Sequence, residues 1–524
     1  MINLINKFKQ YIKENKNLLI EVFAFTFGFG LIAHGYAFFN ANFNHDSLYG
    51  MIGDYEYNIF MLQIGRFIRP IWARIRGNIA LPTLIGFISL FFVSCSNYLI
   101  VRLLKIKNKV LIALSCGILI TNYTVALTYA TYIHDADIYA ISLFLSVLSV
   151  YIFTNRDIKF NYIIGVIIFV ISLGIYQSFL QVTIYLLMIL AIERLINNEK
   201  TSKVVVDNLL TLLCIVISIV IYYAIYLLTL KVFNVPLGDS YNSLPGIEGY
   251  FDLGSIAYIF EQMFKSEKMW LFGKNAHHWW MILGINLLCI VLIVYSFIKT
   301  IIERKTIKTN VVVSVVIMLL MPIGVCSMCV ISRGLIHDIM TYSYFLFYIF
   351  VFKMYEMAFD DKETNFAIYT KYGTYLCICA LLMSNLVYSN EVYIEKELME
   401  QTTLSTMTRV IDRMEQTEGY KMGETPVMMV GVPAISKLSH TRTGFMNTGE
   451  GTNVAFTITY QGLYEKYFND YLAYPINLVD DETVYHYYFN TDGYLKDMPC
   501  FPKAGSVQFY NDMLVVKIAD YGDH

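Results

Sequence analysis

Charged residues are scarce in this chain of 524 residues, because Asp, Glu, Lys and Arg make up 15% of it, whereas soluble domains contain about 25%. That deficit excludes an ordinary cytosolic enzyme. A basic excess is also missing, since 39 lysines and arginines face 41 aspartates and glutamates, which excludes a nucleic-acid-binding protein. What is abundant is apolar: 56% hydrophobic residues and a mean hydropathy of +0.52 predict a polytopic membrane protein.

The cysteines are few and do not form a disulfide framework. Eight of the nine lie in apolar runs, where cysteine acts as a small buried hydrophobic residue, and Cys500 lies outside them. Cys326 and Cys329 have the CxxC spacing of metal and redox sites, but no His or Asp stands beside them in that run. The cysteines therefore indicate neither a disulfide-stapled domain nor a redox centre.

Long apolar runs dominate the first 390 residues. A helix needs about 20 apolar residues to cross the hydrocarbon core of a bilayer. By that criterion the sequence predicts a polytopic α-helical membrane protein of about eleven transmembrane helices, with a transmembrane part, 1–390, and a soluble α+β domain, 391–524. The predicted spans are 18–39, 82–101, 110–130, 138–153, 162–176, 178–192, 209–230, 279–298, 311–331, 339–357 and 374–390.

Lysine and arginine are distributed unevenly over the loops between these spans. If the N-terminus is cytoplasmic, the cytoplasmic segments carry 19 of these residues and the longer opposite loops carry 9. The positive-inside rule therefore predicts a cytoplasmic N-terminus, and the composition favours a bacterial plasma membrane. Segment 162–192 is short for two spans, yet a single span would place the basic loop Lys299–Lys308 outside, so the charges favour two. Eleven spans then place 391–524 outside the cell.

The tail after residue 390 has a different character. Glu391–Glu418 predicts a charged helix that leaves the membrane, and Pro426–Val432 is a compact apolar run typical of a buried strand. Gly505–Asp520 alternates like a hairpin of two strands around Asn511-Asp512. This length suffices for one small α+β domain.

Ionisable residues are almost absent from the interiors of the spans. Ion-coupled transporters keep acids or bases at mid-membrane, so the absence argues against that class. Lys353 and Glu356 lie near span ends, where long side chains reach the interface. The polar residues gather instead in the predicted outside loops.

The first outside loop contains Asn44-His-Asp-Ser47 and then an amphipathic stretch, 60–76. In a helix over this stretch, Arg66, Arg69 and Arg76 lie on one face and apolar residues on the other. One interpretation is an anchoring helix in the membrane interface with arginines that snorkel. The alternative is that their guanidinium groups bind a lipid-linked phosphate.

Two further outside loops combine acids with imidazoles, namely His134-Asp-Ala-Asp137 and Ser332–Asp338. A solvated loop is the simpler explanation of each one by itself. Together with Asp46 they match what sugar transfer from a lipid phosphate requires. A carboxylate deprotonates the acceptor hydroxyl, and cations stabilise the phosphate leaving group.

Four short runs taken in order resemble a known family. They are Asn44-His-Asp-Ser-Leu48, Gln63-Ile-Gly-Arg-Phe67, Asp135-Ala-Asp137 and Leu173-Gly-Ile-Tyr-Gln-Ser178. The chain resembles the membrane glucosyl transferases of the serotype-converting Gtr type II kind, over roughly residues 15–390. The resemblance implies a GT-C fold and a polyprenyl-phosphate-linked sugar donor on the outer face of the membrane.

The resemblance also implies roles by position. It implies catalytic roles for Asp46 in the first outside loop and for a second acidic motif, Asp135 and Asp137, which in some relatives binds a divalent cation such as Mg²⁺ or Mn²⁺. It further implies donor-phosphate binding by Arg66, Arg69 and Arg333, and a sugar or acceptor pocket of His45, His134, Tyr176, Gln177 and His337. A histidine in place of a second acid weakens the case for a metal in the first loop. A plain turn between helices explains the Tyr-Gln pair equally well.

These observations predict a hexosyl transferase, with glucose as the first expectation, that acts on a cell-surface polysaccharide or a teichoic-type polymer. The alternative is a flippase or exporter of lipid-linked sugars, which predicts polar residues along a path across the bilayer. In a third hypothesis the tail is a binding module and the membrane part its anchor, but about eleven spans exceed what an anchor requires. The expected partners are the lipid-linked donor, the glycopolymer acceptor and the bilayer.

Overall fold

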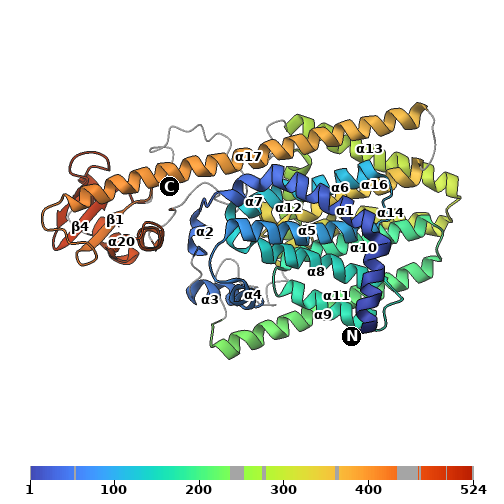
Figure 1. Cartoon of the computed structure of the whole chain (residues 1–524), viewed down its shortest axis with the longest axis horizontal. Helices are drawn as coiled ribbons and strands as arrows, with labels where there is room; N and C mark the ends of the chain where they lie inside the picture. The colour runs from blue at the N-terminus through green and yellow to red at the C-terminus, as the bar shows by residue number, and fades with distance from the viewer. Residues whose placement is uncertain are drawn as a thin grey trace.

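The computed structural model describes residues 2–51, 55–236, 253–273, 279–359, 365–433, 458, 462–490 and 493–521. It shows a bundle of helices and, beside it, a small sheet that belongs to the C-terminal region (residues 391–521) (Figure 1). The long helix α17 (Asn365–Glu415) runs along the bundle and continues into the C-terminal region (Figure 1). The predicted boundary at residue 390 therefore lies inside one continuous helix.

Nine helices in the described part of the chain are long and apolar enough to cross a membrane. The chain is thus a multi-pass membrane protein, although its eleven predicted spans are not all matched by such helices. Predicted span 162–176 corresponds to α9, which has 13 residues, and 339–357 to short 3-10 turns followed by α16, which has 14. The bundle consists of α1 (Ile2–Phe39), α5 (Pro82–Leu103), α6 (Lys109–Thr121), α7 (Tyr123–Thr131), α8 (Ala136–Thr154), α9 (Asn161–Leu173), α10 (Leu180–Ile196), α11 (Thr201–Phe233), α13 (Trp279–Arg304), α14 (Lys308–Val325), α16 (Leu346–Phe359) and α17.

Polar side chains set the ends of these apolar helices. An apolar helix satisfies its own backbone hydrogen bonds, so it needs partners only at its ends and breaks. Asn108 caps α6 by accepting hydrogen bonds from the amides of Val110 and Leu111. Asn122 separates α6 from α7: its Oδ1 accepts from the Val125 amide and its Nδ2 donates to the Ile118 carbonyl. The predicted span 110–130 is therefore two helices in sequence.

The short segment 162–192 forms two helices, α9 and α10, with a reversal between them. Arg156, which precedes α9, and Arg194, at the end of α10, both pair with Asp207, at N–O distances of 2.8 and 2.7 Å. The two ends of the segment therefore return to the same end of the bundle. At the reversal, the carbonyl of Gly174 accepts a hydrogen bond from the Ile68 amide, in the loop after the first span.

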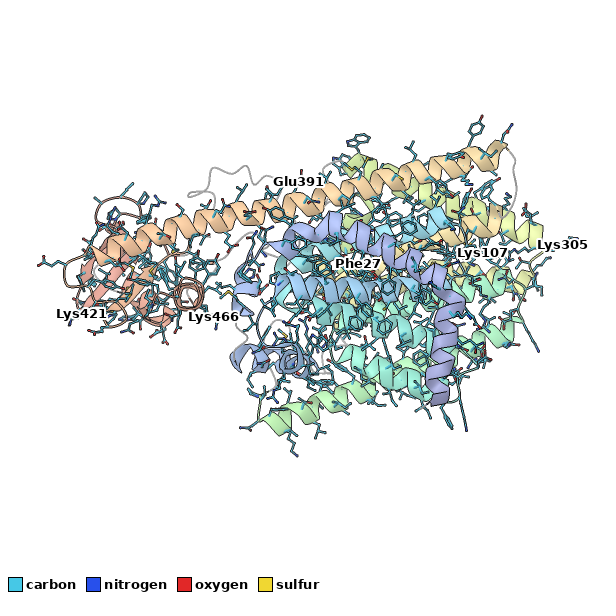
Figure 2. The ribbon with its side chains drawn as sticks, in the orientation of Figure 1. Phe27, Lys107, Lys305, Glu391, Lys421 and Lys466 are labelled. Carbon is cyan, nitrogen blue, oxygen red and sulfur yellow. The ribbon has the colours of Figure 1, made fainter. Side chains whose placement is uncertain are left out.

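The bundle has two chemically different ends. The end next to the C-terminal region is called the domain-facing end. It carries the short helices α2 (His45–Tyr49), α3 (Tyr55–Gln63) and α4 (Arg69–Arg76) (Figure 1). The opposite end, called the distal end, carries the turns near 105, 156 and 198, which line one pocket, and the turn near 305, which Asn198 contacts. Lys107 and Lys305 lie there (Figure 2). Which end faces the cytoplasm remains a prediction from the charges.

One buried ion pair near the distal end corrects a sequence-based expectation. Lys353 was expected to reach the membrane interface. Instead its Nζ lies 2.9 Å from Oε1 of Glu193, and both side chains are 8% exposed. Glu356, by contrast, lies at the distal end, where it accepts a hydrogen bond from the Asn108 amide at 2.8 Å.

The C-terminal sheet has four strands in the order β2-β1-β4-β3. β1 (Pro426–Val430) pairs in parallel with β2 (Asn477–Leu478) and with β4 (Met513–Lys517). β3 (Val507–Tyr510) and β4 form the hairpin predicted around Asn511-Asp512. β1 is central and almost fully buried, which matches the apolar run predicted as a strand. Helix α20 (Asp481–Asn490) packs on one face of the sheet, and α19 (Gly462–Lys466) and the π-helical turn Tyr467–Tyr471 lie on the other.

The hydrophobic core on that second face includes residues from the first loop of the bundle. Phe43, Leu48 and Ala80 are buried in one cluster with Tyr464 and Phe468 of the C-terminal region. The C-terminal region therefore packs directly on the loop that carries the first predicted motif.

Candidate active site

Helix α2 is a single turn that presents the first predicted motif. Asn44 and Ser47 form a capping box: the Asn44 Oδ1 accepts from the Ser47 amide at 3.0 Å, and the Ser47 Oγ accepts from the Asn44 amide at 2.8 Å. Such reciprocal bonds satisfy amides that have no partner within the helix. They leave the two residues in between, His45 and Asp46, on the outside of the turn. The side chain of Asp46 is 36% exposed, and its carboxylate lies 3.2 Å from Nε2 of His45.

The amphipathic stretch is not the single helix predicted over 60–76. α3 ends at Gln63, the backbone turns at Gly65 with a φ of +78°, and α4 begins at Arg69. A side chain at this glycine would be strained by the positive φ, and its Cβ would lie 2.1 Å from the Tyr222 hydroxyl. Within α4 the predicted pattern holds, since Ile71 and Ile75 are exposed by 56% and 71%.

Two arginines of α4 turn inward, onto the second acidic motif. Arg69 donates from Nε to both carboxylate oxygens of Asp135, at 2.9 and 3.1 Å, and both side chains are almost fully buried. Nε of Arg76 lies 2.8 Å from Asp137, which also accepts a hydrogen bond from the Trp72 indole at 2.9 Å. Neither arginine snorkels. The two ion pairs fasten α4 to the loop between α7 and α8.

These contacts decide whether the second motif suits a divalent cation. Asp135 and Asp137 each have an arginine as partner, and a guanidinium neutralises a carboxylate that a metal would require. Among the described residues, no group of three or more His, Cys, Asp or Glu side chains is arranged to hold a metal ion. The donor set therefore does not fit a resident Mg²⁺ or Mn²⁺.

Arg66 is held differently, by aromatic rings. Its Nη1 donates to the Tyr139 hydroxyl at 2.7 Å, and its guanidinium carbon lies 5.5 Å from the centre of that ring and 4.9 Å from that of Tyr176. Both rings line a small cavity, here called the Tyr132 cavity. Its other lining groups include the hydroxyls of Ser89, Thr124, Thr128, Tyr129 and Tyr342. Aromatic faces and hydroxyls of this kind suit a sugar ring.

Asp46 belongs to the same site as this cavity. Burial raises the pKa of the Tyr132 hydroxyl well above its usual value, and the nearby Asp46 carboxylate raises it further, while Arg66 lowers it. Helix α2 packs on the loop that carries this ring: a Cβ at Gly50, which follows α2, would lie 2.3 Å from the His134 ring, whose centre is 6.1 Å from that of Tyr132. The structure thus brings together a partly exposed carboxylate, a guanidinium and an aromatic cavity.

The other predicted site residues have different surroundings. His134 is buried beneath α2, where a Cβ at Gly50 would lie 2.3 Å from its ring. The Gln177 amide donates to the Ile64 carbonyl at 2.9 Å and to the Tyr222 hydroxyl at 2.6 Å, so it supports the turn between α3 and α4.

Arg333 and His337 lie further from the first loop along the chain, after the short helix α15 (Ser327–Ile331). Their loop packs on α12 (Leu253–Leu271), because a Cβ at Gly334 would lie 2.6 Å from the ring of Tyr258.

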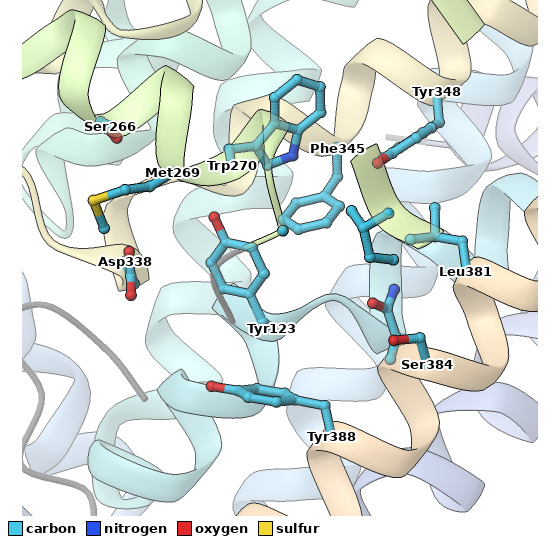
Figure 3. A pocket seen from close by; sticks show the side chains of 13 residues that line it. Tyr123, Ser266, Met269, Trp270, Asp338, Phe345, Tyr348, Leu381, Ser384 and Tyr388 are labelled. Carbon is cyan, nitrogen blue, oxygen red and sulfur yellow. The ribbon is translucent and has the colours of Figure 1, made fainter. Parts of the chain in front are cut away.

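A second small cavity is lined by residues that were not predicted as site residues (Figure 3). Asp338 lies at its edge with Tyr123 and Met269, and Trp270 and Tyr388 line it from α12 and α17. We call it the Asp338 cavity. The hydroxyl of Thr124, which lines the Tyr132 cavity, donates to the Asp338 carbonyl at 3.0 Å, so the two cavities adjoin. The signal in the sequence for this cavity was Asp338, the acid at the end of the run Ser332–Asp338.

Residues 35–354 match the family model described as glucosyl transferase GtrII. The match covers more than half of the chain. This chain belongs to the GtrII glucosyl transferase family. It is therefore a glycosyltransferase, as the resemblance in the four short runs predicted. No curated protein and no solved structure matches it.

The extent of the match separates two parts of this GtrII family member. It includes every predicted site residue, from His45 to His337, and both cavities except for the lining supplied by α17. It does not include the C-terminal region, which nonetheless packs against α2.

A larger, mainly apolar groove lies beside the Asp338 cavity, between α12, α13, α14 and α16. Trp270 lines both spaces, so one face of α12 borders the cavity and the other borders the groove. The helices of the groove expose large apolar side chains, including Ile290, Val294 and Leu320. A groove with this lining suits a hydrocarbon chain.

Proposed function

We propose that this transferase moves a hexosyl group, glucose as the first expectation, from a polyprenyl-phosphate donor to a surface polysaccharide or teichoic-type acceptor. The reaction takes place at the domain-facing end, on the outer face of a bacterial plasma membrane, in a GT-C type of bundle. One observation carries the proposal. Asp46 has no lysine or arginine in ion-pair range within the described part of the chain, and its helix packs on the loop of the Tyr132 cavity, two of whose rings contact Arg66.

The proposed chemistry is a single displacement. The Asp46 carboxylate accepts the proton of the acceptor hydroxyl as that oxygen attacks the anomeric carbon of the donor sugar. The bond between the anomeric carbon and the phosphate oxygen breaks, and polyprenyl phosphate leaves with the electron pair. The guanidinium of Arg66 stabilises the negative charge that develops on the phosphate. Because the acceptor attacks from the face opposite the leaving group, the anomeric configuration inverts.

The surroundings of Asp46 suit each part of this donor. The rings of Tyr132, Tyr139 and Tyr176 and the hydroxyls around them suit the sugar. The apolar groove beside α12 suits the isoprenoid chain. The pairs Arg69–Asp135 and Arg76–Asp137 hold α4, which begins three residues after Arg66. In this proposal those four residues are positioning residues that keep Arg66 against two rings of the cavity.

The test uses purified enzyme in liposomes with a short-chain polyprenyl-phosphate glucose and measures the release of polyprenyl phosphate. We expect Asp46→Asn to lower the rate about 10²- to 10⁴-fold, the usual contribution of a general base. Asp157→Asn at the distal end is the control and leaves the rate unchanged. Undiminished release by Asp46→Asn would overturn the mechanism. Movement of donor across the liposome without release would favour the exporter instead.

A further inference from the structure

One residue of α17 contacts both the first loop and the C-terminal region. Glu400 is 5% exposed, and each oxygen of its carboxylate accepts one hydrogen bond. Oε2 accepts from the backbone amide of Phe43 at 3.0 Å, and Oε1 accepts from the hydroxyl of Tyr471. The donors come from chain segments more than 400 residues apart in the sequence, one just before α2 and one in the C-terminal region.

A second buried residue lies one turn earlier on the same helix. Lys396 is 4% exposed, and its ammonium group donates to the carbonyl of Ala130, near the end of α7. The next residues of the chain lead to Tyr132, His134 and Asp135. The same face of α17 thus holds the loops of both acidic motifs, because residues four apart in a helix lie on one side.

These contacts determine where Asp46 stands. Helix α2 has five residues, and so short a helix is not stable by itself. On one side of Asp46 the chain is held by the Glu400–Phe43 bond. On the other side Leu48, 1% exposed, is buried in the core of the C-terminal region. The Phe43 ring also packs edge-on against Tyr471, with ring centres 6.2 Å apart.

We propose that the C-terminal region completes the catalytic site. Glu400 and Lys396 are positioning residues that fix the position of Asp46 relative to the loop after α7. The inference rests on the proposed role of Asp46 as the base. Displacement of α17 or of the C-terminal region would move α2, and a misplacement of about 1 Å in such a site costs roughly 10² in rate. The family match ends before α17, so it assigns no role to these residues.

The test compares kcat and the donor KM in four variants of the full-length enzyme. Glu400→Leu removes both hydrogen bonds, and Tyr471→Phe removes one hydroxyl and leaves the ring in place. We expect kcat per folded molecule to fall about 10- to 100-fold in Glu400→Leu and less in Tyr471→Phe, with the donor KM nearly unchanged. Glu397→Leu, on the more exposed side of α17, is the matched control and keeps the wild-type kcat. Glu400→Gln, which retains an oxygen for the Phe43 amide, restores part of the activity.

The outcomes separate this inference from the proposed function. If Asp46→Asn lowers release but Glu400→Leu and Tyr471→Phe both turn over at the wild-type rate per folded molecule, the positioning role is wrong. If Asp46→Asn leaves release unchanged, the proposed function itself fails. A purely structural role of Glu400 would lower the melting temperature and the yield without changing kcat. If Glu400→Leu does not fold, the Tyr471→Phe variant decides, because it retains the packing.

Discussion

Arg66 at the domain-facing end and Arg156 at the distal end make similar contacts with tyrosine, Arg66 with Tyr176 and Tyr139 and Arg156 with Tyr162 alone. Each guanidinium carbon lies 4.9 Å from a tyrosine ring centre, and each arginine donates to a tyrosine hydroxyl, at 2.7 and 2.6 Å respectively. Their surroundings differ. Arg156 is 46% exposed and pairs with Asp207, whereas Arg66 lies among rings that line a cavity. The same residue types thus form a surface ion-pair cluster at one end and lie beside the candidate substrate cavity at the other.

The carboxylates at the two ends show the same difference. At the distal end Glu199 and Asp207 pair with Arg194 near the surface, and exposed pairs of this kind contribute little to stability. At the domain-facing end Asp135 and Asp137 pair with arginines in the interior, while Asp46 stays partly exposed beside a histidine. A transferase needs a carboxylate that is accessible to the acceptor. Asp46 meets this need, because Arg69 and Arg76 pair with Asp135 and Asp137 instead.

The largest effect is expected from removing one partner of a buried ion pair at each end. Asp135→Asn leaves Arg69 without its carboxylate, and Glu193→Gln does the same to Lys353. Each is expected to cost about 3–5 kcal/mol of the free energy of unfolding, because a buried charge loses its partner. Thermal unfolding in detergent measures the cost, and turnover per folded molecule distinguishes the ends. Only Asp135→Asn should lower turnover; equal turnover in both variants would remove the functional difference between the ends.

A smaller effect is expected from the two arginine–tyrosine contacts. Arg66→Gln should lower the rate of polyprenyl phosphate release about 100-fold, because a donor aimed at the developing phosphate charge is lost. Arg156→Gln, with its matched contact at the distal end, should leave the rate unchanged. Similar losses in both variants would show that the contact itself, rather than its place beside the cavity, accounts for the effect.

A third prediction concerns the turn that aims Arg66. Gly65→Ala should destabilise the protein by about 1–2 kcal/mol through its positive φ alone, and by more through the contact with Tyr222. Gly493→Ala is the control, since its φ of +79° matches that of Gly65 but a Cβ there would meet nothing within 4 Å. The difference between their melting temperatures isolates the contact. Equal losses would show that Tyr222 moves aside.

The smallest effect on stability is expected from a substitution at the distal end. The hydrogen bond from Arg194 lowers the pKa of Glu199 from 4.5 to about 2. A lowered pKa stabilises the fold above the unfolded-state value and loses this effect as the pH falls toward the folded-state value. Glu199→Gln should therefore cost about 0–1 kcal/mol at pH 7 and nothing near pH 2. Melting curves of both proteins at the two pH values test it, and a cost that persists at low pH would contradict an electrostatic origin.

Local patterns in the sequence predicted most of the elements. The apolar runs predicted the helices of the bundle, and the alternation in Gly505–Asp520 predicted the β3–β4 hairpin, because both depend on residues that are close along the chain. The break at Gly65 was missed, since the apolar period continues through it. Lys353 was misplaced at the interface because its partner, Glu193, lies 160 residues earlier in the chain.

The acids and arginines of the site were visible as residue types, but their pairing was not. Sequence alone identified a membrane protein, the two acidic motifs and the family, since hydrophobicity and short motifs are written in consecutive residues. Only the tertiary structure decided that Arg69 and Arg76 engage Asp135 and Asp137, and that Glu400 of α17 holds the turn of Asp46. Those contacts join residues that are 61 to 357 positions apart in the sequence. Such partners are brought together by packing in three dimensions, because no periodic pattern along the chain specifies them.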